Sequence, residues 1–260
     1  MRKTMFILVV AAMVIATPLF AQTVIERHDF SSMGNWVPGP GDWSVSGNRL
    51  HQNDARAALA RVDKSLAQQG VYQIDFNVRY IDGGYRSAQD LRNQHFHAGF
   101  GVQIGVSNPP LRRTAWGLGE SYLLWLNLDT RPDTRRNYPQ HFGVRAQVYE
   151  SRSLTSMDLM RGPGVEALLG SPVMSVDIAE ALYREFGYVL RVEDVLPYLH
   201  NEFPISIRVN TRTGEVGVKD PTAPIRFYFR LDPSVLRGDY IALRTNGLAA
   251  SFSDFLATSR

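Results

Sequence analysis

Amide, guanidinium and aromatic side chains occur at alternate positions within four segments, a combination that suits the binding of a sugar or an extended peptide. Amides and guanidinium groups form hydrogen bonds with hydroxyls, and an aromatic ring packs against the apolar face of a sugar. Successive strand residues point to opposite faces, so these residues should share the face turned away from the core. The predicted ligand-binding face comprises Asp75, Asn77, Arg79, His97, Gln103, Trp125, Asn127, Arg145, Gln147 and Tyr149.

Small residues and one loop aromatic complete this candidate site. Gly99, Gly101 and Gly105 leave room above the predicted sheet for a ligand to approach. Trp116 lies in a glycine-bearing loop, where an aromatic residue is readily interpreted as a ligand contact. The alternative is that the polar face is merely solvated, or is covered by a helical insertion.

The residues that could perform catalysis or bind a metal are sparse. The chain has no cysteine, which excludes disulfides, cysteine-ligated metals and a cysteine nucleophile. His95 and His97 could share a metal with a carboxylate, but no H-E-x-x-H or similar motif supplies further ligands. No Ser-His-Asp arrangement can be identified from spacing. We therefore predict no catalytic residues and no metal ligands.

The elements that must position these side chains are mostly strands. Apolar and polar residues alternate in 71–80, 96–106, 121–128 and 142–150, which is typical of antiparallel strands with one buried face. A second series of shorter strands is predicted in the C-terminal part, at 204–210, 215–218, 225–231, 239–245 and 249–257. Many short strands in succession predict an antiparallel β-sandwich of the jelly-roll kind.

One segment, about 151–203, departs from this pattern. Ser175 can cap a helix that Gly187 ends, and a second helix is predicted from Arg191 to Leu199, interrupted by Pro197. About 50 residues make a marginal core by themselves. We therefore expect a helical insertion within a single domain spanning residues 22–260.

Residues 1–21 have the order of a secretory signal peptide: Arg2 and Lys3, an apolar stretch, and a small residue, Ala21, at the cut. Removing Arg2 and Lys3 lowers the basic count from 28 to 26 against 25 acidic residues, a net charge of about +1. Nucleic acid is therefore not an expected partner. No later stretch is apolar enough for a membrane span, and no cysteine can carry a lipid anchor. We expect a periplasmic or extracellular bacterial protein.

Three stretches resemble the concanavalin A-like lectin/glucanase superfamily, in its laminin-G-like branch. The first runs from His28-Asp29-Phe30 to Trp43-Ser44-Val45-Ser46-Gly47-Asn48-Arg49-Leu50. The second is the strand at 205–209 with the Gly214 turn, and the third joins 238–244 to Phe252-Ser253-Asp254-Phe255. The resemblance covers the chain except for residues 1–21 and the insertion, and implies a concanavalin A-like sandwich. Superfamily members divide between glycan binding, polysaccharide cleavage and protein adhesion.

The resemblance also bears on activity and cofactors. The glucanase branch carries E-x-D-x-x-E, which this sequence lacks, so a non-catalytic role is favoured. Some members hold calcium, which would involve Asp29 or Asp254 here, but such residues are more often turn or cap residues, and no cofactor is predicted. The expected function is glycan recognition at the bacterial envelope. A structural or protein-interaction role in a periplasmic or surface assembly, with an envelope protein as partner, stays open. So does a glycoside hydrolase or polysaccharide lyase whose carboxylates are not aligned.

Overall fold

The computed structural model describes residues 22–107, 115–160, 174–190, 192–222 and 226–260. The predicted signal peptide, residues 1–21, lies outside the described residues. Within them, no helix is long and apolar enough to cross a membrane.

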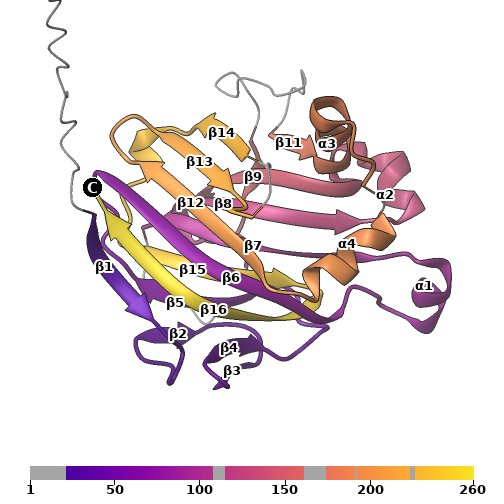
Figure 1. The fold of residues 1–260 in the computed structure, drawn as a ribbon, viewed down its shortest axis with the longest axis horizontal. Coiled ribbons are helices and arrows are strands. Elements are labelled where there is room, and N and C mark those ends of the chain that lie inside the picture. The colour runs from indigo at the N-terminus through magenta and orange to yellow at the C-terminus, as the bar shows by residue number, and fades with distance from the viewer. Residues whose placement is uncertain (1–21, 108–114, 161–173, 191, 223–225) are drawn as a thin grey trace, which may run out of the picture.

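Two antiparallel sheets of eight strands each, in the part of the chain described, pack face to face (Figure 1). The predicted mainly β sandwich is therefore confirmed. Sheet A has the order β14 (Arg226–Arg230), β13 (Glu215–Lys219), β12 (Phe203–Asn210), β6 (Val71–Gly83), β16 (Leu248–Ser259), β4 (Arg49–Gln52) and β3 (Trp43–Ser46), with β1 (Thr23–His28) beside β16. Sheet B has the order β10 (Asp158–Leu159), β9 (Gly143–Ser153), β8 (Gly119–Asp129), β7 (His97–Val106), β15 (Tyr240–Asn246), β5 (Ala60–Ser65) and β2 (Trp36–Pro38), with β11 (Ser175–Asp177) beside β9.

Alternation along the strands produces the core between the sheets. On β6, Ile74 and Phe76 are buried while Gln73 and Asp75 are only partly so. Sheet B contributes inward side chains such as Phe100 to the same core. Burying such side chains contributes roughly 1.5–3 kcal/mol each, so the period-two pattern largely specifies the sandwich.

The four strands predicted to share one polar face do not all belong to the same sheet. The strand β6 lies in sheet A, whereas β7, β8 and β9 are neighbours in sheet B. Hydrophobic alternation fixes the face of a residue within its own strand, but it does not say which strands pair. The predicted ligand-binding face is thus divided between the two outer surfaces of the sandwich.

In its described residues, the segment predicted as a helical insertion contains two helices, α3 (Ile178–Phe186) and α4 (Val192–Leu199). Gly187 ends α3 in a left-handed conformation and Pro197 lies inside α4, both as expected. The cap of α3 is Asp177, whose side chain accepts from the Glu180 amide at 3.1 Å, and not Ser175. Ser175 instead begins β11, and β10 and β11 both pair with β9, so the segment also extends sheet B.

Short helices lie at the ends of the strands. They are α1 (Ala88–Asn93), α2 (Pro132–Asn137) and the 3-10 turns η1 (Pro139–His141) and η2 (Pro233–Val235). The connection between β8 and β9, formed by α2 and η1, contacts β8 and helps to build the candidate site.

Candidate functional site

Register in sheet B brings the polar and aromatic residues of three strands onto one outer face. Trp125 on β8 lies opposite Gly101 on β7 and Gln147 on β9. One step along, Asn127 lies between Gly99 and Arg145. The structure thus places seven of the sequence-predicted residues together, namely His97, Gln103, Trp125, Asn127, Arg145, Gln147 and Tyr149.

The three predicted residues from β6 do not join them. Asp75, Asn77 and Arg79 lie on the outer face of sheet A, on the other side of the sandwich. Both oxygens of Asp75 accept from Gln73, and the Asn77 amide donates to Asp254 at 2.9 Å. Their assignment to one common face was wrong, because the alternation of β6 matches that of its neighbours without belonging to the same sheet.

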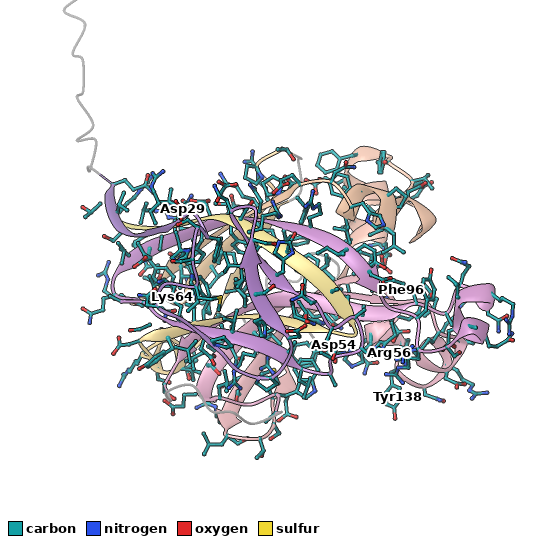
Figure 2. All side chains as sticks on the ribbon, turned by 90° about the horizontal axis from the view of Figure 1, so that it is seen from below. Asp29, Asp54, Arg56, Lys64, Phe96 and Tyr138 are labelled. Carbon is teal, nitrogen blue, oxygen red and sulfur yellow. The ribbon has the colours of Figure 1, made fainter. Side chains whose placement is uncertain are left out.

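A pocket of about 520 Å³ opens on the outer face of sheet B, and we call it the aromatic pocket. Strand residues form its floor, while the Trp116 loop and the β8–β9 connection form its walls. Tyr138 stands at the rim with 60% of its surface exposed and projects from the ribbon in Figure 2. The pocket is lined by Ala58, Leu59, His97, Trp116, Trp125, Asn127, Asp129, Arg131, Thr134, Tyr138, His141, Tyr149 and Asn246.

Aromatic rings dominate one side of this pocket. The rings of Trp116 and Tyr149 are nearly parallel, at 14° with centroids 6.4 Å apart, and Trp125 meets Trp116 edge-on at 5.6 Å. The ring of Trp125 lies over Gly99, where an added Cβ would come within 2.4 Å of it. Gly99 and Gly101 therefore make room for Trp125, and Gly105 lies against the backbone of Val235 and Leu236, which corrects the expectation of open space above the sheet.

A buried arginine holds the Trp116 loop against sheet B. Arg244 is fully buried, and its guanidinium donates to the carbonyls of Trp116 at 2.5 Å and Ala115 at 2.6 Å. It also donates to the Gln103 side chain at 2.7 Å and lies 5.3 Å from the Trp116 ring centroid. Burial lowers the pKa of Arg244 to about 9, so the group stays charged at neutral pH. Gln103 is itself fully buried, so it positions Arg244 and cannot contact a ligand as predicted.

Asp129, a carboxylate that is not among the predicted site residues, fixes the opposite wall of the pocket. Its oxygens accept from Arg131 Nε at 3.0 Å, Arg131 Nη2 at 2.6 Å and Thr134 Oγ1 at 2.8 Å. These charge-assisted bonds hold the start of α2 over the strand end. The alternation that marks Trp125 and Asn127 continues to Asp129, and that was the available signal for this residue.

His97 presents a neutral ring to the pocket. Arg86 Nη2 lies 3.1 Å from its Nδ1, and an arginine can only donate, so the proton of the neutral ring is on Nε2. That nitrogen lies 3.8 Å from Asp129 Oδ2. Burial is the largest of the effects that lower the pKa of His97 to about 4, so the ring is uncharged at neutral pH.

Beneath Tyr149, Gln147 connects three segments. It is buried, and its amide nitrogen lies 2.9 Å from the Gln140 carbonyl and 3.0 Å from His141 Nδ1. Its oxygen accepts from the Tyr149 hydroxyl at 2.9 Å. Burial lowers the pKa of His141 and raises that of Tyr149, which keeps both groups uncharged near neutrality. Gln147 is therefore a positioning residue and not the ligand contact that we predicted.

The guanidinium of Arg145 also bonds to other residues of the protein and does not face the pocket. Its Nε donates to the Phe142 carbonyl at 2.7 Å, and its Nη2 pairs with Asp177 of β11 at 3.2 Å. The predicted insertion thus covers this end of the face, and Arg145 does not line the aromatic pocket. Asn127 does line it, although its amide nitrogen donates to the His141 carbonyl at 2.7 Å. Of the predicted contacts, those lining the pocket are His97, Trp116, Trp125, Asn127 and Tyr149.

Metal-ligating groups are scattered in the described residues, where no cluster of three or more His, Cys, Asp or Glu could hold an ion. His95 faces Asp90 at 3.8 Å, away from the Asp129 that faces His97. Asp29 accepts from the Ser31 amide, and Asp254 accepts from Asn77 and Ser253.

No protein-family model matches the sequence, and no curated protein matches it. Among solved structures, a galectin-like protein of unknown function from Bacillus subtilis is similar at 10% identity and a TM-score of 0.47, over 92% of this chain and 97% of that one. A Bauhinia forficata lectin in complex with GalNAc is similar at 11% identity and a TM-score of 0.43, over 92% of this chain and 99% of that one. The CBM2 module of an evolved Dit protein of Lactobacillus casei BL23 phage J-1 is similar at 8% identity and a TM-score of 0.47, over 92% of this chain and 96% of that one. These likenesses concern the sandwich fold alone and do not single out a laminin-G-like branch.

Proposed function

We propose that the protein is a non-catalytic glycan-binding domain of the bacterial envelope and that the aromatic pocket is its binding site. The observation that carries the proposal is the set of three aromatic rings, Trp116, Trp125 and Tyr149, walling a 520 Å³ pocket whose other side is polar. A pocket of this size falls within the usual range for small ligands, about 300–1,000 Å³.

The two sides of the pocket match the two faces of a sugar ring. The C–H face of a sugar packs against the broad side of an indole or phenol ring, and Trp116 and Tyr149 are both only partly buried. The hydroxyls need donors and acceptors at fixed positions. The Nε2–H of His97 supplies a donor, and the side-chain oxygen of Asn127 supplies an acceptor.

The chemistry of the lining supports binding over hydrolysis. Glycosidases ordinarily place two carboxylates about 5–9.5 Å apart across the scissile bond. Among the described residues that line the pocket, Asp129 is the single carboxylate, and four hydrogen bonds from Arg131 and Thr134 already occupy it.

A glycan array tests this proposal. The wild-type protein should bind a restricted set of glycans, and Trp116→Ala should weaken that binding about tenfold or more, the cost expected of an anchoring aromatic. Trp43→Ala is the matched control, because Trp43 stacks on Phe252 in sheet A. Equal binding by both variants, or no bound glycan on a broad array, would exclude the site.

The proposed location and domain organisation rest on the sequence. We propose that residues 1–21 direct export and that residues 22–260 fold as one domain. Expression of the full chain in a bacterium, followed by fractionation and N-terminal sequencing, should give a periplasmic or secreted product that starts at Gln22. A cytoplasmic product that retains Met1 would refute the export proposal.

A further inference from the structure

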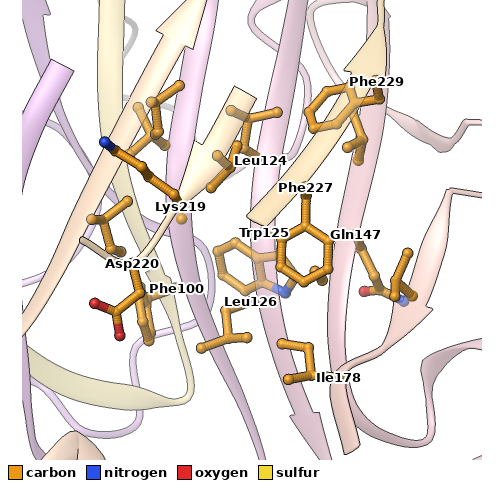
Figure 3. Close-up of a pocket in the computed structure, with 18 of the residues that line it drawn as sticks. Phe100, Leu124, Trp125, Leu126, Gln147, Ile178, Lys219, Asp220, Phe227 and Phe229 are labelled. Atoms are coloured by element: carbon orange, nitrogen blue, oxygen red, sulfur yellow. The ribbon is translucent and has the colours of Figure 1, made fainter. Parts of the chain in front are cut away.

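A second pocket, of about 880 Å³, opens on the outer face of sheet A over β12, β13 and β14, and we call it the basic groove. Figure 3 shows Phe227 and Phe229 of β14 in the hollow between the sheets, together with Leu124 of β8. Tyr228 lies between these two phenylalanines in the strand, so its side chain points to the outer face. The basic groove and the aromatic pocket therefore lie on opposite outer surfaces of the sandwich.

Cationic side chains from all three strands surround the basic groove. Arg208 of β12, Lys219 of β13 and Arg230 of β14 line it, and Arg226 is the direct cross-strand partner of Lys219. All four side chains are exposed. Arg230 pairs with Glu215 at 3.3 Å, whereas the other three form no ion pair with any described residue. Like charges directly opposite each other are unfavourable, so an anion would stabilise the pair of Lys219 and Arg226.

The neighbouring carboxylates do not neutralise this charge. Asp75 of β6 accepts with both oxygens from the Gln73 amide, at 3.0 and 2.9 Å. Asp220, which follows β13, accepts from the amide and the hydroxyl of Thr222, at 2.7 and 2.6 Å. Arg260, the last residue of the sequence, also lines the groove and is left out of this count. The groove therefore keeps a local excess of positive charge.

An exposed aromatic ring stands among these charges. Tyr228 has 64% of its surface exposed and lies directly opposite Gly217 of β13. Because Gly217 has no side chain, the tyrosine ring packs over it, and an added Cβ would come within 3.1 Å of that ring. The ring is thus supported by the neighbouring strand while most of its surface stays open. A ring held in this way is suited to the apolar face of a sugar.

Two amide side chains that line the groove have groups left to bond a ligand. The Asn210 oxygen accepts from the backbone amides of Arg212 and Thr213 at 3.1 and 3.2 Å, which leaves its NH2 group to donate. The Gln73 nitrogen donates to Asp75, which leaves the Gln73 oxygen to accept. Neither of these remaining groups has a partner among the described residues. Sugar hydroxyls both donate and accept, so they can serve the two groups.

We propose that the basic groove binds an acidic polysaccharide built of uronate sugars. The carboxylates pair with Arg208, Lys219 and Arg226, a sugar ring packs on Tyr228, and the hydroxyls bond the amides. Side chains two residues apart on a strand are about 7 Å apart, and neighbouring strands lie about 4.8 Å apart, so the cations are spread along the groove. Charges at such intervals match a polymer with one carboxylate on each sugar better than a single small anion. The site is separate from the aromatic pocket and does not depend on the function proposed for it.

Calorimetric titration with an oligogalacturonate, and with an uncharged malto-oligosaccharide of equal length, tests the proposal. The wild-type protein should bind the oligogalacturonate saturably and the uncharged oligosaccharide much more weakly. Arg208→Gln combined with Lys219→Gln should weaken oligogalacturonate binding about tenfold or more. Arg92→Gln combined with Arg136→Gln, on the exposed surfaces of α1 and α2, removes the same net charge and should have no effect. Equal losses in the two double variants would mean that net charge alone attracts the ligand, which would overturn the proposal.

The aromatic part of the groove is tested with matched tyrosines. Tyr228→Ala should weaken oligogalacturonate binding about threefold to tenfold, whereas Tyr183→Ala, 62% exposed on α3, should leave it unchanged. Single-stranded DNA of equal charge is the competing polyanion and should bind more weakly than the oligogalacturonate. DNA binding of equal strength, or no saturable oligogalacturonate binding by the wild type, would overturn the proposal.

Trp116→Ala distinguishes the two sites. This variant should keep wild-type affinity for the oligogalacturonate, and the variant that combines Arg208→Gln with Lys219→Gln should keep the glycan binding of the aromatic pocket. Loss of oligogalacturonate binding by Trp116→Ala would place that ligand in the aromatic pocket and overturn the assignment to the basic groove. Failure of either site therefore leaves the test of the other intact.

Discussion

At the scale of single residues, the outer face of sheet B divides into side chains that line the aromatic pocket and side chains that support them. The rings of Trp116, Trp125 and Tyr149 line the pocket, while the polar atoms of Gln103 and Arg145 form hydrogen bonds with neighbouring residues. Residue type alone predicts both groups equally well, because an amide or guanidinium can serve a ligand or a carbonyl. What distinguishes them is the partner, and partners come from distant segments.

Tyr138 offers a clean test of the pocket rim. It is 60% exposed and lines the pocket, whereas Tyr183 on α3 is 62% exposed and does not. Tyr138→Ala should weaken glycan binding by about threefold to tenfold, as expected for one partly exposed aromatic contact. Tyr183→Ala should bind as the wild type does. Affinity gel electrophoresis with the preferred glycan measures both, and an equal effect of the two substitutions would argue against this rim.

His97 makes a prediction about pH. Its pKa falls from 6.5 to about 4 on folding, so between those values the unfolded chain binds a proton that the folded chain does not. The stability that neutral His97 contributes is thus present above pH 6.5 and is lost as the pH falls toward 4. Urea unfolding at pH 7 and pH 5 should show a smaller loss for His97→Gln than for the wild type. Identical losses would mean that His97 does not titrate in this way.

At the scale of elements, the β8–β9 connection is the wall that the strands below it hold in place. Hydrogen bonds from strand side chains hold it: Asn127 bonds to the His141 carbonyl, Gln147 bonds to the Gln140 carbonyl, and Asp129 accepts from Arg131 and Thr134 at the start of α2. The long strands β6, β7, β8 and β9 follow from alternation, which the local sequence shows directly, whereas β5, buried at five consecutive positions, was not predicted. The β8–β9 connection was not predicted either, since its position depends on side chains of two strands that become neighbours only in the folded sheet.

Gln147→Leu tests the role of this anchor. The leucine removes the bonds of the Gln147 amide to the Gln140 carbonyl and the Ser175 hydroxyl. Because the Ser175 hydroxyl still donates to the Gln140 carbonyl, the substitution should cost about 0.5–1.5 kcal/mol of unfolding free energy, as expected for one net hydrogen bond. Because the connection carries His141 and Tyr138, glycan binding should weaken as well. Gln89→Leu on the exposed surface of α1 is the control. A Gln147→Leu variant with wild-type stability and affinity would contradict the anchoring role.

At the scale of the whole molecule, the pairing of strands distant in sequence determines which side chains share a face, and the sequence pattern does not reveal that pairing. The strands predicted at 71–80 and 121–128 both form, as β6 and β8, yet they belong to different sheets. Asp75 and Trp125 consequently point away from opposite sides of the sandwich. Buried charge was equally inaccessible to prediction, because Arg61, Asp63 and Arg244 acquire their environment only when β5, β15 and β7 come together.

Arg244→Met tests how far this buried charge supports the fold. Methionine fills much of the space, but the carbonyls of Ala115 and Trp116 lose their donor. The loss should be about 3–5 kcal/mol of unfolding free energy, because buried acceptors left unpaired cost about 1–3 kcal/mol each. Arg212→Met on the surface should cost little. Chemical denaturation measures the difference, and comparable stability of the two variants would refute the role of Arg244.

The most direct test of the account as a whole is a crystal structure with the tightest-binding glycan from the array. We predict that a sugar ring will lie in the aromatic pocket, packed against Trp116 or Tyr149, with a hydroxyl within hydrogen-bond distance of His97 or Asn127. An ordered glycan bound anywhere else on the molecule, with the aromatic pocket empty, would contradict the central claim.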